Sequence, residues 1–192
     1  GLRTDNLGAL GTRLLLRRMG VEEASPAFLA AAVRRCSRLM PQAASRCGPL
    51  QPRVHCYAEY SVELGGRLLE GTLERTNGLQ DDTVPRPRWL RPVALPISAF
   101  VERELCAEFQ LLEAACEVFA RSASGGPPAP QAARGSMALA VTGASCLSCA
   151  CAASQFRLLW PGVRLSVGMI CRRGDAVPVS QAPAMGLATA SS

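Results

Sequence analysis

The chain has 192 residues, of which 48% are hydrophobic and 19% are charged, and its net charge is +6. This length allows one large core but not two large domains, and the composition excludes an intrinsically disordered protein. All 21 basic residues are arginines, which we attribute to a bias toward GC-rich codons, although guanidinium groups also suit phosphate binding. The positive charge favours an anionic partner.

No segment has the features of a membrane span or a secretory signal. The apolar run Leu14-Leu15-Leu16 is closed by Arg17-Arg18, and no stretch approaches the ~20 apolar residues of a spanning helix. Nine cysteines, an odd number in a chain with a large core, favour reduced thiols over a disulfide scaffold. We therefore expect a protein that acts in the cytoplasm and has no membrane partner.

The first fifty residues are predicted to form two helices. Leu7 to Met19 has helical spacing and stops at Gly20. Ser25-Pro26 is a helix start, because an N-cap residue precedes a proline, and we expect this second helix to end at Pro41. Residues 1–50 are thus expected to pack as a helical segment on a core domain of residues 51–180, with a flexible tail at 181–192.

A β-hairpin is predicted next. Apolar and polar residues alternate from Val54 to Leu64, Gly65-Gly66 is a two-residue turn signal, and Leu68 to Thr76 forms the second strand. Residues 79–97 have no regular pattern and contain four prolines.

The remaining chain alternates helices and strands. In chain order we expect a helix from Ala99 or Leu105 to Ala120, a linker at 122–135, a strand at 137–141, a helix at 146–160, a strand at 163–170 and a last strand at 176–179. A hairpin followed by strand–helix–strand units predicts the α/β class, with a three-layer α-β-α sandwich around a mixed five-stranded sheet. Trp160 is expected in the core.

Three cysteines and one glutamate lie in two short clusters, each at the start of a predicted helix. Cys106 and Glu108 form the first cluster, and the C-x-x-C of Cys146 and Cys149 forms the second. A C-x-x-C that opens a helix can place two sulfurs on one tetrahedral metal, and Cys106 can supply a third. The pattern predicts a Zn²⁺ site with an open fourth position for water, and Glu108 as a proton carrier that is not a ligand.

A structural interpretation of these cysteines remains open. A lone C-x-x-C is a weak signal, because buried cysteines often serve as small hydrophobic residues, as we expect for Cys116 and Cys151. A purely structural zinc site closes its fourth position with another Cys or His, which Cys151 could do only awkwardly from the same helix. The alternative to catalysis is therefore a zinc-stabilised binding module.

These motifs resemble the cytidine deaminase-like superfamily, in particular its bacterial polymorphic-toxin branch. The resemblance covers roughly residues 52–180 and is carried by Cys106-Ala-Glu108-Phe-Gln-Leu-Leu, Thr142-Gly-Ala-Ser-Cys146-Leu-Ser-Cys149, Gln155-Phe156, Trp160-Pro161 and the strand from Val163 to Val167. It departs from the family where Cys106 replaces the commoner His and Ser145 replaces a Pro. The resemblance implies zinc ligation by Cys106, Cys146 and Cys149, a proton shuttle at Glu108, and antiparallel last strands.

Several residues are candidates for substrate contacts. Arg86, Arg88, Trp89 and Arg91 lie in the proline-rich segment, and arginine beside an aromatic ring is typical of single-stranded nucleic acid binding. Packing of Trp89 into the core is an equal alternative. Further candidate contacts are Arg172, Ser145 and the single histidine, His55, which we place on the polar side of the hairpin.

The sequence therefore predicts a zinc-dependent deaminase that converts cytosine to uracil in nucleic acid. We favour single-stranded DNA as the substrate over duplex DNA or RNA, and expect a monomer. The alternatives are a deaminase for free nucleosides or nucleotides, or for adenine. The resemblance further implies a toxin domain that is delivered into another cell and has an immunity protein as its partner.

Overall fold

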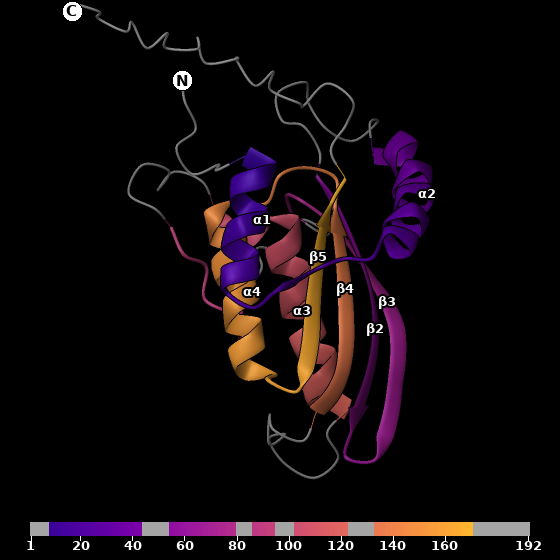
Figure 1. Ribbon diagram of the computed structural model, residues 1–192, viewed down its shortest axis with the longest axis vertical. Helices are drawn as coiled ribbons and strands as arrows, with labels where there is room; N and C mark the ends of the chain where they lie inside the picture. Colours follow the sequence, from indigo (N-terminus) through magenta and orange to yellow (C-terminus); the bar gives the residue numbers. More distant parts are fainter. Residues whose placement is uncertain (1–7, 44–53, 80–85, 95–101, 123–132, 171–192) are drawn as a thin grey trace, which may run out of the picture.

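A computed structural model describes residues 8–43, 54–79, 86–94, 102–122 and 133–170 (Figure 1). Its elements in chain order are α1 (Gly8–Arg18), β1 (Glu22–Glu23), α2 (Pro26–Ala43), β2 (His55–Leu64), β3 (Arg67–Thr76), the 3-10 helix η2 (Arg103–Leu105), α3 (Ala107–Ser122), β4 (Ala133–Val141), α4 (Leu147–Leu159) and β5 (Val163–Met169). Within this part of the chain, no helix combines the length and apolar character needed to cross a membrane.

The described strands form one mixed five-stranded sheet in the order β1-β5-β4-β2-β3. Strands β1, β5 and β4 are parallel, whereas β2 is antiparallel to both β4 and β3. The carboxyl ends of the parallel strands therefore meet at one edge of the sheet. That edge also receives the amino end of β2, since Cys56 pairs with Val141.

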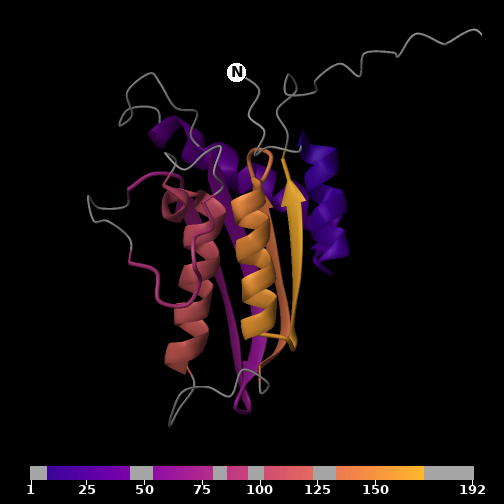
Figure 2. The same ribbon diagram turned by 90° about the vertical axis from the view of Figure 1, so that its left-hand side faces the viewer.

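Helices cover both faces of the sheet, which confirms the predicted α/β sandwich. Figures 1 and 2 show α1, α3 and α4 on one face and α2 on the other. On the α2 side, Phe28 stacks on Tyr57 with ring centroids 6.0 Å apart, and Ala32 and Cys36 are buried beside Ala140. Helix α1 buries Leu16 in the main core on the other face, so both N-terminal helices contribute buried residues.

The hairpin turn follows the sequence prediction. Gly65 and Gly66 have φ angles of 58° and 78°, which a two-residue turn between twisted strands requires and which glycine adopts without a Cβ penalty. Ten residue pairs, from His55–Thr76 to Leu64–Arg67, continue the ladder away from this turn.

Most element boundaries differ from the sequence predictions by one or two residues, and three differences are informative. Strand β4 begins at Ala133 rather than 137, because Gly135, which we had placed in the linker, has a φ of 148° and lets the backbone approach Ser61 so closely that a Cβ would lie 2.1 Å from its carbonyl oxygen. Helix α2 continues past Pro41 to Ala43. A two-residue strand, β1, forms the fifth strand, and the predicted strand at 176–179 with its antiparallel pairing lies outside the described residues.

The main core lies between the sheet and helices α3 and α4, and an aromatic group centres on Phe119. Its ring centroid lies 5.5 Å from that of Tyr60, 5.4 Å from that of Trp160 and 6.2 Å from that of Phe156. Trp160 is buried, as predicted, and its indole N–H donates to the Cys116 sulfur at 3.3 Å. Cys116 is thus a packed core thiol, as the sequence indicated.

We expect Phe119→Ala to lower the free energy of unfolding by about 3–5 kcal/mol, because the truncation leaves a cavity among three aromatic rings. Urea denaturation followed by tryptophan fluorescence measures this loss. The matched control is Leu158→Ala, since Leu158 is 78% exposed and its loss should change the free energy by less than about 0.5 kcal/mol. Equal effects of the two substitutions would contradict this description of the core.

Candidate metal centre

Two connections bring the cysteine clusters to the carboxyl edge of the sheet. The segment from Thr142 to Cys146 joins the end of β4 to the start of α4, so that Cys146 caps this helix and Cys149 lies in its first turn. Cys106 has the corresponding place before α3, since its carbonyl accepts from the Gln110 N–H at 3.0 Å. Helices α3 and α4 lie side by side on one face, which brings their starts together (Figure 2).

The thiols of Cys106, Cys146 and Cys149 are close enough to bind one metal ion. Their sulfur atoms all lie within 4.8 Å of one another, and the Cys146 and Cys149 sulfurs are 3.4 Å apart. Tetrahedral ligation with metal–sulfur bonds of about 2.3 Å requires sulfurs about 3.8 Å apart, so the donor set fits such an ion. Among the described residues no fourth ligand atom joins the group, and Cys151 lies outside it.

Hydrogen bonding distributes the acidity of the three thiols unevenly. The pKa of Cys146 is lowered, chiefly by hydrogen bonding with the thiols of Cys106 and then Cys149. A hydrogen bond with Cys146, followed by burial, raises the pKa of Cys106. Hydrogen bonds with Cys106 and then with Cys146 raise the pKa of Cys149, and burial adds to that rise. Because thiolates are the ligands, metal binding has to displace the protons of these two cysteines.

Glu108 lies beside the thiols as a buried carboxyl group in the first turn of α3. Burial, followed by the negative charge of Cys146, raises the pKa of Glu108 to about 7. Hydrogen bonds with the side chains of Ser145 and Cys149 oppose this rise. The structure therefore brings Glu108 and Ser145 together with the cysteine cluster, and a carboxyl group with this pKa can both accept and donate a proton near neutral pH.

The loop from Thr142 to Cys146, here called the cysteine loop, is held from two sides. The Thr12 hydroxyl of α1 donates to the Ser145 carbonyl at 3.1 Å, and both groups are buried. On the side of β2, the His55 N–H donates to the Thr142 hydroxyl at 2.9 Å and the Thr142 N–H donates to the His55 carbonyl at 2.9 Å. A side chain from the N-terminal helix is thus part of the support of the cysteine loop.

The prediction that His55 lies on the polar side of the hairpin is wrong, since only 3% of its surface is exposed. Neighbouring strand residues point to opposite faces, and Cys56 lies in the core beneath α3, where burial and then the charge of Glu108 raise its pKa. The His55 side chain therefore belongs to the other face, where α2 packs on Tyr57. Its backbone, through Thr142, borders the cysteine loop.

Residues 86–94, the arginine-rich segment, are fixed on α3 and α4 by acidic and amide side chains. The Glu113 carboxylate accepts from the N–H groups of Arg88, Trp89 and Leu90 at 2.5, 3.0 and 2.8 Å. The Gln155 amide binds both backbone groups of Arg91, at 2.8 and 2.9 Å. Such contacts between residues far apart in the chain leave no periodic signal in the sequence.

The side chains of this segment differ in their surroundings. Trp89 is half-buried, packs against the main core and donates from its indole N–H to Glu117 at 2.8 Å. These contacts agree with the alternative in which Trp89 packs into the core. Arg86, Arg88 and Arg91 are exposed, and Arg88 pairs with Glu117 at 3.6 Å. Their contact with nucleic acid stays a prediction, and Arg172 lies outside the described residues.

A groove of about 640 Å³ lies away from the cysteine cluster, between α1, β1 and β5. Leu10, Arg13 and Leu14 of α1 line one side, and Glu22 and Val167 line the other. None of the candidate site residues borders it, so the cluster of titratable groups, rather than the groove, defines the candidate site.

One charged residue near the cluster was missed by sequence reasoning. Arg103 belongs to η2, one turn before Cys106, and only 5% of its surface is exposed. An arginine in a segment with exposed Glu102 and half-buried Glu104 has no feature that predicts burial. Its proximity in sequence to Cys106 was the available signal.

Comparison with known proteins finds no match to this chain among protein families, curated proteins or solved structures.

Proposed function

We propose that this protein is a zinc-dependent deaminase that converts cytosine to uracil in nucleic acid. The observation that carries the proposal is the grouping of three thiols with a buried carboxyl group that is not one of the clustered ligands. This is the constellation that zinc deaminases of nucleobases use, with Cys106, Cys146 and Cys149 as ligands and Glu108 as general acid and base. The thiol-rich donor set favours Zn²⁺ over the hard cations Mg²⁺ and Ca²⁺.

The proposed reaction assigns each residue a separate task. A zinc ion held by the thiolates of Cys106, Cys146 and Cys149 would supply an activated water molecule. Glu108 would accept one proton as the water oxygen bonds to C4 of cytosine and deliver it to N3. It would then take the second proton from the C4 hydroxyl and pass it to the amino group, so that ammonia leaves as the C4–N4 bond breaks and the C4 carbonyl forms. The hydrogen bond with Ser145 holds the Glu108 carboxyl group beside the cysteine loop.

A nucleic acid polymer, rather than a free nucleoside, is favoured by the charge of the helical side of the molecule. Elements α1, α3, α4 and the arginine-rich segment contain three glutamates, of which Glu108 is buried and Glu113 and Glu117 bind the segment itself. The same elements contain eight arginines: Arg13, Arg17, Arg18, Arg86, Arg88, Arg91, Arg121 and Arg157. A surface of this charge attracts phosphates.

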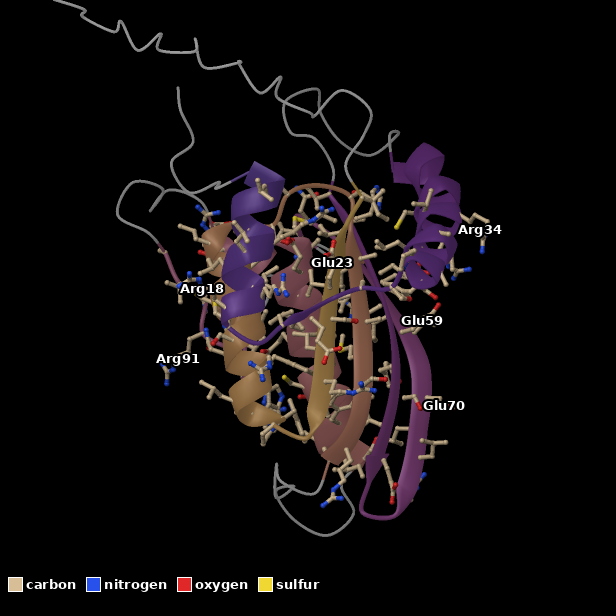
Figure 3. All side chains as sticks on the ribbon, viewed as in Figure 1. Arg18, Glu23, Arg34, Glu59, Glu70 and Arg91 are labelled. Atoms are coloured by element: carbon tan, nitrogen blue, oxygen red, sulfur yellow. The ribbon has the colours of Figure 1, made fainter. Side chains whose placement is uncertain are left out.

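The arginines also lie on elements that lead to the cysteine loop. Helix α1 binds this loop through Thr12, and the arginine-rich segment contacts the first turn of α4, where the Ser148 hydroxyl donates to the Val93 carbonyl. In Figure 3, Arg18 and Arg91 project on the side of α1 and α4, whereas Glu59 and Glu70 project on the side of the hairpin. A nucleic acid strand whose phosphates bind these arginines would therefore run beside the candidate metal centre.

The direct test is incubation of the purified zinc-loaded protein with single-stranded DNA, duplex DNA and RNA, followed by sequencing. We expect C-to-T changes, most of them in single-stranded DNA. A-to-G changes would instead identify an adenine deaminase. Absence of editing on every polymer, together with ammonia release from cytidine or deoxycytidine, would identify a deaminase for free nucleosides. If neither the polymers nor the free nucleosides gave a product, the result would favour a zinc-stabilised binding module without catalytic activity.

We further expect Arg18→Glu combined with Arg91→Glu to weaken binding of single-stranded DNA, because both substitutions remove phosphate contacts. Each lost contact should also reduce the slope of log affinity against log salt concentration by about 0.7. Fluorescence polarisation at several salt concentrations measures both effects. The control is Arg34→Glu combined with Arg67→Glu, an equal charge change at exposed residues of α2 and β3. Equal losses in the two double variants would show that net charge, not this surface, determines binding.

A further inference from the structure

The start of α4 holds two thiols next to each other. Cys146 is the N-cap of this helix, since its carbonyl accepts from the Ala150 N–H at 3.0 Å, and Cys149 is the third helical residue. The side chain of an N-cap residue points toward the second or third residue of its helix. The sulfur atoms of Cys146 and Cys149 consequently lie 3.4 Å apart.

This separation lies between the distances that two kinds of bonding require. Two thiolates on one tetrahedral zinc ion are about 3.8 Å apart, whereas the two sulfurs of a disulfide are about 2.05 Å apart. The Cα atoms of helical residues three positions apart are separated by about 5 Å, within the range of about 4.4–6.8 Å that a disulfide needs. Rotation of the two side chains is therefore sufficient to form the bond.

The two thiols differ in their access to solvent. Cys146 is half-buried, so a small oxidant can reach it, whereas only 4% of the surface of Cys149 is exposed. An outer thiol that reacts first and an inner thiol that completes the bond are what thiol–disulfide exchange at a C-x-x-C motif requires. Cys116 differs in both respects, since it is buried in the core and lies outside the thiol group.

We propose that Cys146 and Cys149 are also a redox site, which low-molecular-weight disulfides such as glutathione disulfide oxidise in the metal-free protein. In the first step the Cys146 thiolate bonds to one sulfur of the small disulfide, whose S–S bond breaks and releases one small thiolate. The Cys149 thiolate then bonds to the Cys146 sulfur and releases the second. The protein dithiol loses two electrons and two protons, and the small disulfide gains them as two thiols.

Formation of this disulfide and binding of a metal exclude each other. The bond removes two of the three clustered ligands and leaves Cys106, which alone cannot hold zinc as three thiolates do. The inference rests on the proposed function only in its use of a metal at these cysteines. Zinc occupancy, and with it the proposed activity, therefore depends on the thiol–disulfide balance of the surroundings.

The test is oxidation of the chelator-treated full chain by excess glutathione disulfide, with differential alkylation and peptide mapping to locate each bond. We expect a Cys146–Cys149 bond and a Cys106 thiol that can still be alkylated. Zinc at 100 times its dissociation constant leaves about 1% of the centres free, so it should slow this oxidation about 100-fold. The control is the same oxidation in guanidinium chloride, where the unfolded chain should give mixed pairings of its nine cysteines.

Three substitutions separate the redox pair from the metal centre. Cys106→Ser should lose metal affinity but still form the disulfide, because it leaves the start of α4 unchanged. Cys146→Ser should lose both properties. Cys151→Ser, on the same helix but outside the thiol group, is the matched control and should keep both.

The inference is overturned if the metal-free protein is not oxidised, if Cys106 forms the bond with either of the other two cysteines, or if the folded and unfolded chains give the same pairings. An oxidation rate that bound zinc leaves unchanged overturns the mutual exclusion. A wild type that forms the Cys146–Cys149 bond but takes up no zinc would support the redox pair and overturn the metal centre, so the two failures are distinguishable.

Discussion

Glu108→Gln is expected to retain one zinc ion per chain and to lose deamination by about 10²–10⁴-fold, the usual contribution of a general acid and base. The amide keeps the shape of the carboxyl group but cannot carry the proton from water to the base. Because Glu108 is buried, removing an ionisable group from this position should leave the melting temperature unchanged or slightly higher. Single-turnover editing assays and metal analysis on the same preparation measure both properties.

The matched control is Glu104→Gln, which makes the same chemical change in η2, on the other side of Cys106. It should retain both zinc and activity. If Glu108→Gln retained full editing, Glu108 could not be the proton carrier. If it lost zinc along with activity, the glutamate would be a ligand, contrary to its position outside the thiol group.

Cys146→Ser is expected to have the second large effect, a loss of metal affinity of more than about 100-fold, beyond the loss seen when only a partner of a ligand is removed. Cys146 supplies the thiol that ionises most readily and caps α4. A serine hydroxyl stays protonated near neutral pH and is a poor substitute for a thiolate. Competition between the protein and a chelator for zinc measures the affinity.

Cys151→Ser is the control for this substitution, because Cys151 lies on the same helix but outside the thiol group. We expect it to bind zinc as the wild type does. In the wild type, zinc at 100 times its dissociation constant should stabilise the fold by about 2.7 kcal/mol, and Cys146→Ser should lose this increment. An unchanged zinc affinity in Cys146→Ser, or an equal loss in both variants, would exclude the proposed ligand set.

The parts of the fold that the sequence predicted are those with strong local patterns. Alternation and the Gly65-Gly66 turn define the hairpin, and the C-x-x-C marks the start of α4. The delivery of Cys146 and Cys149 to the carboxyl edge of the sheet followed from a general rule about the strand before them, and Cys106 was assigned to the same site because it also opens a helix. The cysteine cluster was therefore predictable before its geometry was known.

What could not be predicted depends on packing between distant segments. The two residues of β1, both glutamates, have no apolar pattern and become a strand only by pairing with β5. The burial of His55 follows from the cover that α2 gives to the second face of the sheet. Arg103 likewise lacks a signal of its own, since its burial depends on how η2 packs.

The hydrogen bond between Thr12 and Ser145 joins residues 133 positions apart in the chain. Helix α1 also buries Leu16, and the turn that follows it buries Val21, in the same core that supports α3 and α4. A shortened protein that began at residue 51 would keep the three cysteines and Glu108. It would lose the hydrogen bond from Thr12 that supports the cysteine loop. The smallest portable form of this domain, for fusion to another protein, therefore includes α1.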